Sequence, residues 1–300
     1  MKLTKKLLPA LGMLALSTCM MVTSTFAWFA MNENVSATGM TVQARGDQVY
    51  LQIINPSSTK DVVGEDNQVT KVPVTFEDGA NQTSAAATTT GVKLLPVNVV
   101  DKINEAVTTG EAPNQVTTYS CDAYKGADKM VWVTSIGQSN SNGSAGAQYK
   151  DVTSDAETNT NKYYLKNTFN IRLDPTAGAT AASNPLKISS IATSSNADAF
   201  KNCLNVLVVS KVYNLGADGK IGGSDDTLAS TQGAVWECNN NVFTKKTGSE
   251  TLSNGVFSAL TYAVIDVYVF FNGDDTDCTQ AVLATAANAG YDVTVNFTVA

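Results

Sequence analysis

Hydrophobic and polar residues alternate with a period of two along much of the chain, which predicts β-strands. The cleanest alternation covers residues 291–299, and residues 163–173 carry five apolar side chains of one parity. Residues 262–271 form a run of β-branched and aromatic side chains. Further strand-like segments are residues 49–54, 72–76, 130–134, 186–191 and 203–212. Pro73 marks 72–76 as an edge strand, because proline cannot donate to a ladder.

Polar stretches of small residues separate these segments. Residues 78–91, 135–148 and 174–184 predict long surface loops. Helical patterns are few, and cover residues 101–107, 196–202 and 276–289. Strands that do not alternate with helices predict an all-β fold, an antiparallel β-sandwich of jelly-roll or immunoglobulin-like type with one or two short helices. Within it, residues 56–149 are the least regular and form either an insertion or a second small lobe.

The first residues have the pattern of a targeting segment. Lys2, Lys5 and Lys6 precede the uncharged residues 7–31, and Ala27 supplies a small residue for cleavage. This pattern predicts a secretory signal peptide at 1–27 and a sandwich domain at 28–300. The alternative is a retained transmembrane anchor, because the uncharged stretch is long enough to span a bilayer. Under the first interpretation, the partner during export is a signal peptidase, and the chain meets the membrane only then.

The amino-acid composition excludes several classes of function. The 300 residues hold 20 Lys and Arg, 27 Asp and Glu and no histidine, for a net charge of −7. Without imidazole there is no Ser-His-Asp or Cys-His pair and no HExxH zinc site. An acidic chain also lacks the basic surface that binds nucleic acid. The sequence therefore predicts a protein that is not an enzyme and needs no cofactor.

Cysteine is the next candidate for chemistry. Of the five cysteines, Cys19 leaves with the predicted signal peptide. An even number in an exported chain permits two disulfides with three connectivities, and the alternative is small buried thiols. The four candidates are Cys121, Cys203, Cys238 and Cys278.

A weak cation site is predicted in residues 214–225, which partly match an EF-hand loop. The candidate calcium ligands are Asn214, Asp218, the carbonyl of Lys220, and Asp225. Gly216 at the third place supplies no side-chain oxygen, so the favoured alternative is a glycine-rich hairpin tip. Three further acids, Asp274, Asp275 and Asp277, are interpreted as complementing the dipole of a helix at 276–289.

Two segments resemble a known group of proteins. Residues 25–32 (TFAWFAMN) and 35–44 (VSATGMTVQA) resemble the junction in Gram-positive exported proteins whose signal peptide is cut by a SipW-type signal peptidase. That group includes the TasA and camelysin fibre-forming matrix proteins. Residues 267–278 are similar to a strand followed by an acidic turn in clostridial-type members. The resemblance implies a surface or matrix structural protein with a jelly-roll fold. Camelysin members are described as metalloproteases, but a histidine-free chain offers no such site.

These observations predict a secreted subunit of a pilus-like extracellular fibre or biofilm matrix on a Gram-positive-type bacterium. Identical subunits would form a homopolymer by β-strand addition through the mature N-terminus. The candidate assembly residues are Trp28, Phe29, Val35, Ala37, Met40 and Val42. A competing interpretation pairs this segment within its own subunit. The alternative functions are a monomeric surface adhesin or carbohydrate-binding module, and a secreted hydrolase with two carboxylates.

Overall fold

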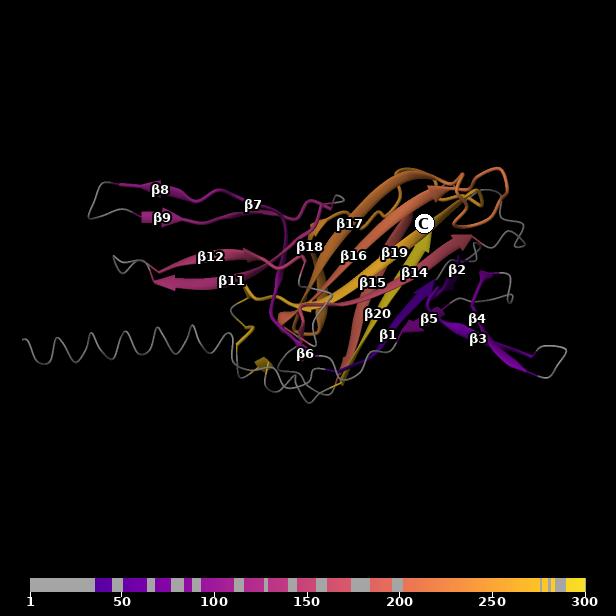
Figure 1. The fold of residues 1–300 in the computed structure, drawn as a ribbon, viewed down its shortest axis with the longest axis horizontal. Helices are drawn as coiled ribbons and strands as arrows, with labels where there is room; N and C mark the ends of the chain where they lie inside the picture. The colour runs from indigo at the N-terminus through magenta and orange to yellow at the C-terminus, as the bar shows by residue number, and fades with distance from the viewer. Residues whose placement is uncertain are drawn as a thin grey trace, which may run out of the picture.

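The structure is a computed structural model, and it describes residues 36–44, 51–63, 68–76, 84–87, 93–110, 116–126, 129–139, 145–154, 161–173, 184–195, 202–275, 277–279, 282–283 and 290–299. Nearly all the regular structure in these residues is β-strand, arranged mainly in antiparallel sheets (Figure 1). The predicted all-β, sandwich-like fold is therefore confirmed. Among the described residues no helix has the length and apolar character needed to cross a membrane.

The largest sheet has six strands in the order β18-β17-β16-β19-β14-β2, and every neighbouring pair is antiparallel. The long apolar runs of the sequence form its centre. Its strands are β2 (Leu51–Ile54), β14 (Leu165–Leu173), β16 (Leu204–Asn214), β17 (Thr227–Asn239), β18 (Val242–Gly248) and β19 (Thr261–Phe271).

A second sheet has four strands in the order β15-β20-β1-β5. The β20 strand pairs antiparallel with β15 on one side and parallel with β1 on the other. The β5 strand pairs antiparallel with the far side of β1. The bounds are β1 (Ser36–Ala44), β5 (Ser84–Ala87), β15 (Leu186–Ser195) and β20 (Gly290–Val299).

Side chains of these two sheets share one hydrophobic cluster, here called the main core. On β20 every second residue from Val293 to Val299 is buried in it, as the alternation predicted. On β14, Phe169, Ile171 and Leu173 are buried in the same way. Two sheets that each bury one face against a common core form a sandwich.

The other face of the six-stranded sheet carries a second cluster. Trp132 packs with its ring centroid 4.4 Å from that of Tyr164 and 5.1 Å from that of Phe270. Trp132 belongs to a four-stranded sheet in the order β10-β7-β11-β12, which therefore covers part of this face. Its strands are β7 (Asn98–Ile103), β10 (Cys121–Ala123), β11 (Val131–Ser139) and β12 (Ala145–Asp151).

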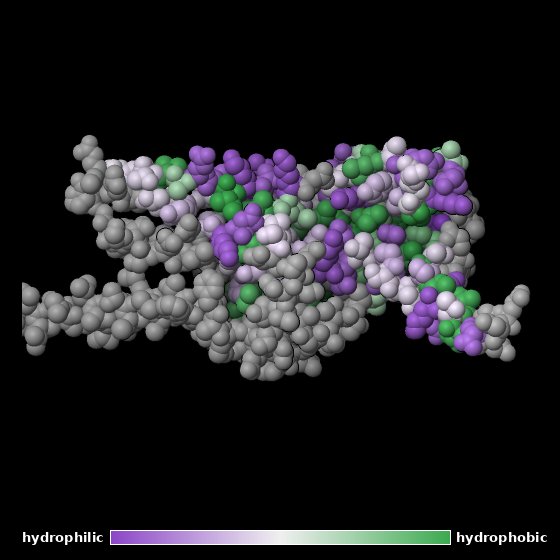
Figure 2. Space-filling model, viewed as in Figure 1, coloured by the Kyte–Doolittle hydropathy of each residue, from purple (hydrophilic) through white to green (hydrophobic). Residues whose placement is uncertain are grey.

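Three two-stranded pairs complete the fold. They are the parallel pair β6 (Lys93–Leu94) and β13 (Asn161–Lys162), and the hairpins β3 (Thr59–Val63) with β4 (Val69–Pro73) and β8 (Val107–Thr109) with β9 (Val116–Thr118). The two hairpins lie at opposite ends of the long axis in Figure 1. The β3–β4 hairpin carries exposed valines, seen among hydrophilic residues at the lower right of Figure 2.

Some sequence predictions are wrong. Residues 101–107 are not helical, because β7 extends to Ile103 and β8 begins at Val107. The buried Val99 and Val100 hold this segment in a sheet, and tertiary packing overrides local pattern. The predicted loops 78–91 and 135–148 contain β5 and most of the β11–β12 hairpin. Their small residues give no strand signal, and backbone pairing with neighbouring strands decides their conformation.

Other predictions fall wholly or mainly outside the described residues. Residues 1–35, with the signal peptide, Cys19, Trp28, Phe29 and Val35, are among them. So are residues 174–183 of the third predicted loop and most of the predicted helices at 196–202 and 276–289. In the last of these, the described part contains a helical turn, in which the Leu283 N–H donates to the Thr279 carbonyl at 3.0 Å.

Candidate functional site

The β1 strand, which carries the candidate assembly residues, lies inside the four-stranded sheet of its own chain. Met40 and Val42 pair with Val293 and Val295 of β20, and on the other side with Ala87 and Ala85 of β5. The register shifts between Ala37 and Gly39, where the glycine interrupts the pattern. This arrangement is the pairing within one subunit that the sequence left open as an alternative.

The pairing places β1 between β20 and β5 in this sheet. One face of β20 packs on the main core through Val293, Val295 and Phe297. Its edge away from β15 is covered by β1, and β5 contacts β20 only through β1 in the strand order. We call the position between β20 and β5 the β1 slot. An empty slot would leave the backbone N–H and C=O groups of β20 unpaired along that edge.

Three of the predicted calcium ligands converge in the loop between β16 and β17, and the fourth, Asn214, is the last residue of β16. A methyl group placed on Gly223 would lie 2.7 Å from Asp225 Oδ1 and 3.4 Å from both Asp218 Oδ1 and the Lys220 carbonyl oxygen. The Asn214 side chain contacts β17, since its Nδ2 donates to Thr227 Oγ1 at 3.5 Å. Within the described part of the chain, no three Asp, Glu, His or Cys side chains gather where they could hold a metal. Calcium binding here stays a prediction that rests on two carboxylates and a carbonyl.

Asp226, which the sequence analysis did not single out, organises the same loop. Its Oδ1 accepts the Gly216 N–H at 2.8 Å, and its Oδ2 accepts the Gly222 N–H and the Tyr262 hydroxyl, each at 2.8 Å. The bond from Gly216 is the largest of the effects that hold the pKa of Asp226 below its usual value. Burial, followed by the bond to Asp226, raises the pKa of Tyr262 to about 12. One signal in the sequence could have indicated this role. Asp226 is an acidic residue directly before a strand and after a glycine-rich stretch.

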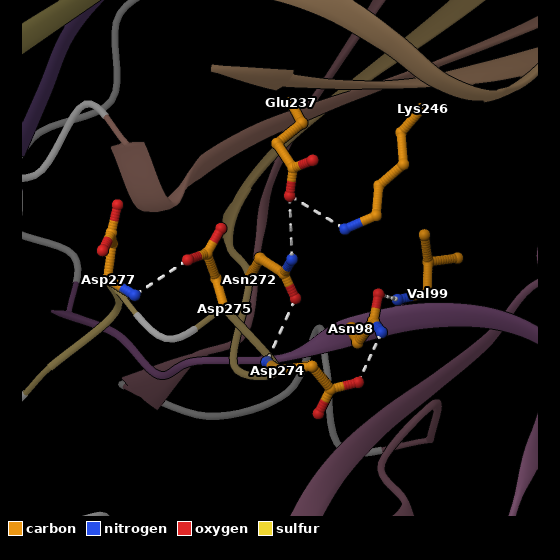
Figure 3. A network of polar contacts seen from close by, with 8 residues as sticks. All are labelled: Asn98, Val99, Glu237, Lys246, Asn272, Asp274, Asp275 and Asp277. Carbon is orange, nitrogen blue, oxygen red and sulfur yellow. Dashed lines mark hydrogen bonds and ion pairs between the residues drawn. The ribbon is translucent and has the colours of Figure 1, made fainter. Parts of the chain in front are cut away.

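The acidic residues after β19 take part in a structural network (Figure 3). Asp274 Oδ2 accepts Asn98 Nδ2 at 2.7 Å, and its backbone N–H donates to Asn272 Oδ1 at 3.1 Å. Asn272 Nδ2 reaches Glu237 Oε1 at 3.4 Å, which also pairs with Lys246 Nζ at 2.8 Å. The network joins the turn after β19 to β7, β17 and β18.

Asp275 and Asp277 close the turn itself, as Figure 3 also shows. The Asp277 N–H donates to Asp275 Oδ1 at 2.8 Å, and the Cys278 N–H donates to the Asp275 carbonyl at 3.0 Å. The described carboxylates of these acids therefore accept hydrogen bonds from backbone N–H groups and side-chain amides.

The four candidate disulfide cysteines are thiols in this structure. Cys203, Cys238 and Cys278 are buried in the main core. Cys121 is half-buried on β10, where burial, followed by the charges of Asp274 and Asp122, raises its pKa to about 11.

A surface cavity of about 530 Å³ lies where β2 ends, beside the β16–β17 loop. Its lining is mostly apolar and includes Ile54, Phe76 and Ile221, with Thr75, Asn170 and Lys220 as polar members. Arg172 stacks over the Phe76 ring at 4.5 Å from its centroid.

Comparisons of the chain with protein-family models, with curated proteins and with solved structures found no match. The resemblance to fibre-forming matrix proteins therefore stays a prediction from residues 25–44 and 267–278.

Proposed function

We propose that this chain is a secreted structural subunit of an extracellular fibre, and that its copies are joined by exchange of β1. In this arrangement the β1 strand of one copy fills the β1 slot of the next, and catalysis plays no part. The observation that carries the proposal is the position of β1. It lies between two strands, β20 and β5, neither of which is its neighbour in sequence.

The connectivity makes such an exchange geometrically simple. A parallel pair such as β1–β20 cannot be closed by a tight turn. The route from β1 to β5 passes through β2, β3 and β4, so no short hairpin ties β1 to either neighbour. A β1 strand from another copy would make the same backbone hydrogen bonds as the chain's own. Exchange of an identical element between protomers is a low-cost route to assembly.

The predicted maturation fits the same proposal. Cleavage after Ala27 would make residues 28–35 the free N-terminal end, which a donated β1 carries to the neighbouring copy. There, Trp28 and Phe29 would fill a pocket and fix the register, as aromatic anchors do in protein interfaces. The proposed location is the surface or extracellular matrix of the producing cell.

Negative-stain microscopy of the purified secreted chain tests the proposal, and we expect filaments. Thr41 pairs with Thr294 on one side and with Ala86 on the other. Thr41→Pro removes a backbone donor within the slot, so this variant should remain a folded monomer. The matched control is Thr70→Pro in the β3–β4 hairpin, outside the sandwich sheets, which should still form filaments.

Two results would contradict the proposal. Filaments of Thr41→Pro as abundant as those of the unmodified chain would exclude exchange of β1. Loss of β-type circular dichroism in Thr41→Pro, with Thr70→Pro unaffected, would show that β1 is an ordinary internal strand.

A further inference from the structure

Two buried cysteines from segments far apart in sequence meet in the main core. Cys203 directly precedes β16, and Cys278 lies in the segment that leads from β19 towards β20. Their exposed fractions are 0% and 7%. The two thiols lie within hydrogen-bonding reach of each other.

Flanking contacts hold both segments in place. The residue before each cysteine takes part, since Asn202 Nδ2 donates to Asp277 Oδ2 at 3.2 Å. The Cys203 carbonyl accepts the Asn272 N–H at 2.9 Å. Asn202 also accepts the Asn240 N–H at 2.9 Å, which fixes it to the β17–β18 turn. The meeting of the two cysteines therefore does not depend on the thiol contact alone.

We propose that Cys203 and Cys278 form a disulfide in the exported protein, while Cys121 and Cys238 stay thiols. The proposal rests on the export that the proposed function requires. Cys121 lies outside the main core. Cys238 lies within the main core, on β17. Because Asn205 of β16 pairs with Glu237 of β17, the residue opposite Cys238 is Leu204 and not Cys203.

The oxidant is a small-molecule disulfide such as oxidised glutathione. One cysteine thiolate attacks this disulfide and forms a mixed disulfide, which releases one glutathione thiolate. The second cysteine thiolate then attacks the protein sulfur of the mixed disulfide, and the other glutathione leaves. The protein loses two hydrogens, and two glutathione molecules are formed.

The environment of the thiols sets when this reaction takes place. The hydrogen bond with Cys203, together with burial, raises the pKa of Cys278 well above its usual range. Only the thiolate is nucleophilic, so the packed thiols should react slowly. The disulfide should therefore form while the exported chain is still folding, before the main core closes.

Such a bond would join the start of β16 in the six-stranded sheet to the segment that leads into β20. The two cysteines are 75 positions apart, as are the flanking Asn202 and Asp277. Closure of a loop this long lowers the entropy of the unfolded chain and stabilises the folded one. It would also keep β20, which forms one wall of the β1 slot, attached to the main sheet.

Oxidative refolding tests the proposal. A full chain that carries Cys19→Ser has only the four described cysteines, and it is reduced, denatured and refolded with glutathione and its disulfide. We expect a mass lower by two hydrogens, two thiols instead of four, and a peptide that links Cys203 to Cys278. The thermal midpoint should exceed that of the reduced protein by about 10 °C. Folded reduced protein should gain the bond more slowly.

Two variants test which cysteines form the disulfide. Cys278→Ser should lose both the cross-link and the shift in midpoint, whereas Cys238→Ser should keep both. Four thiols after oxidative refolding, or a linkage that involves Cys121 or Cys238, would overturn the proposal. The measurement uses monomers, so a failure to form filaments would reject the proposed function and leave the disulfide result standing.

Discussion

At the scale of single residues, glycine makes one contact of the fold possible. Gly248, the last residue of β18, has φ of 85° and lies against the backbone of Gly233 on β17. A Cβ atom at Gly248 would collide with the Gly233 carbonyl oxygen. A Cβ atom at Gly233 would in turn collide with the Tyr124 hydroxyl oxygen, so the second cluster packs against bare backbone here.

We expect Gly248→Ala to lower the free energy of unfolding by about 3 kcal/mol, from left-handed strain and overpacking together. The matched control is Gly255→Ala. Gly255 has φ of 99° but no atom within 4 Å of the position of a Cβ, so only the strain remains, at about 1 kcal/mol. Urea unfolding of both variants measures the difference. Equal effects would show that the close contact with Gly233 contributes nothing.

The Asp226–Tyr262 pair should make stability depend on pH at both extremes. The pKa of Asp226 is lowered from 3.8 in the folded chain, so its contribution is present above that value and is lost as the pH falls below it. The pKa of Tyr262 rises from 10.0 to about 12, so its contribution is present below pH 10 and is lost as the pH rises through 12.

Denaturant unfolding across the pH range checks this. Asp226→Asn should lose less stability than the unmodified chain on acidification, and Tyr262→Phe should lose less between pH 10 and 12. Tyr119→Phe, outside this network, is the control. Alkaline curves of the unmodified chain and Tyr262→Phe that run parallel would contradict the expectation.

The convergence of Asp218, Lys220 and Asp225 around Gly223 leads to a calcium prediction. Calcium, if it binds, should do so weakly, because two carboxylates are few for this ion. Calorimetric titration should then show a binding signal that Asp218→Ala abolishes and Asp275→Ala leaves intact. The reverse pattern would assign the ion to the acidic turn after β19, and a signal unchanged by both variants would exclude both sites.

At the scale of elements, strands could be predicted from the sequence where their side chains determine them. The β14, β16, β19 and β20 strands carry alternating or continuous apolar residues, and they form the sandwich sheets close to their predicted bounds. The β5 and β12 strands were not predicted, because their small residues carry no strand signal. These strands exist because a neighbouring backbone pairs with them, and such long-range pairing has no local signature.

The candidate cation site shows the same difference between features with a local signal in the sequence and features that depend on distant strands. The residues near Gly223 were predicted from the spacing of their side chains, and three of the four ligand positions converge. The role of Asp226 was missed, because it depends on Tyr262, which comes from a strand 36 positions away. The parallel pairing of β1 with β20 could not be predicted either, since it joins opposite ends of the described chain.

At the scale of the whole molecule, the proposed exchange concerns the smaller sheet and not the larger one. The six-stranded sheet consists of β18, β17, β16, β19, β14 and β2, so β1 is not one of its strands. The β1 strand completes the smaller sheet without a hairpin to either neighbour. In the proposed fibre, therefore, each subunit keeps its six-stranded sheet and exchanges this strand.

The most direct test asks which copy supplies β1. Light and isotopically heavy chains, both with a photoreactive residue in place of Thr41, are unfolded, mixed and assembled together, then irradiated. The partners of Thr41 are Thr294 on β20 and Ala86 on β5. If β1 is exchanged between copies, β1 peptides should cross-link to β20 or β5 peptides of the other isotope as often as to those of their own isotope. Cross-links within one isotope alone would contradict it, since each chain would then fill its own slot.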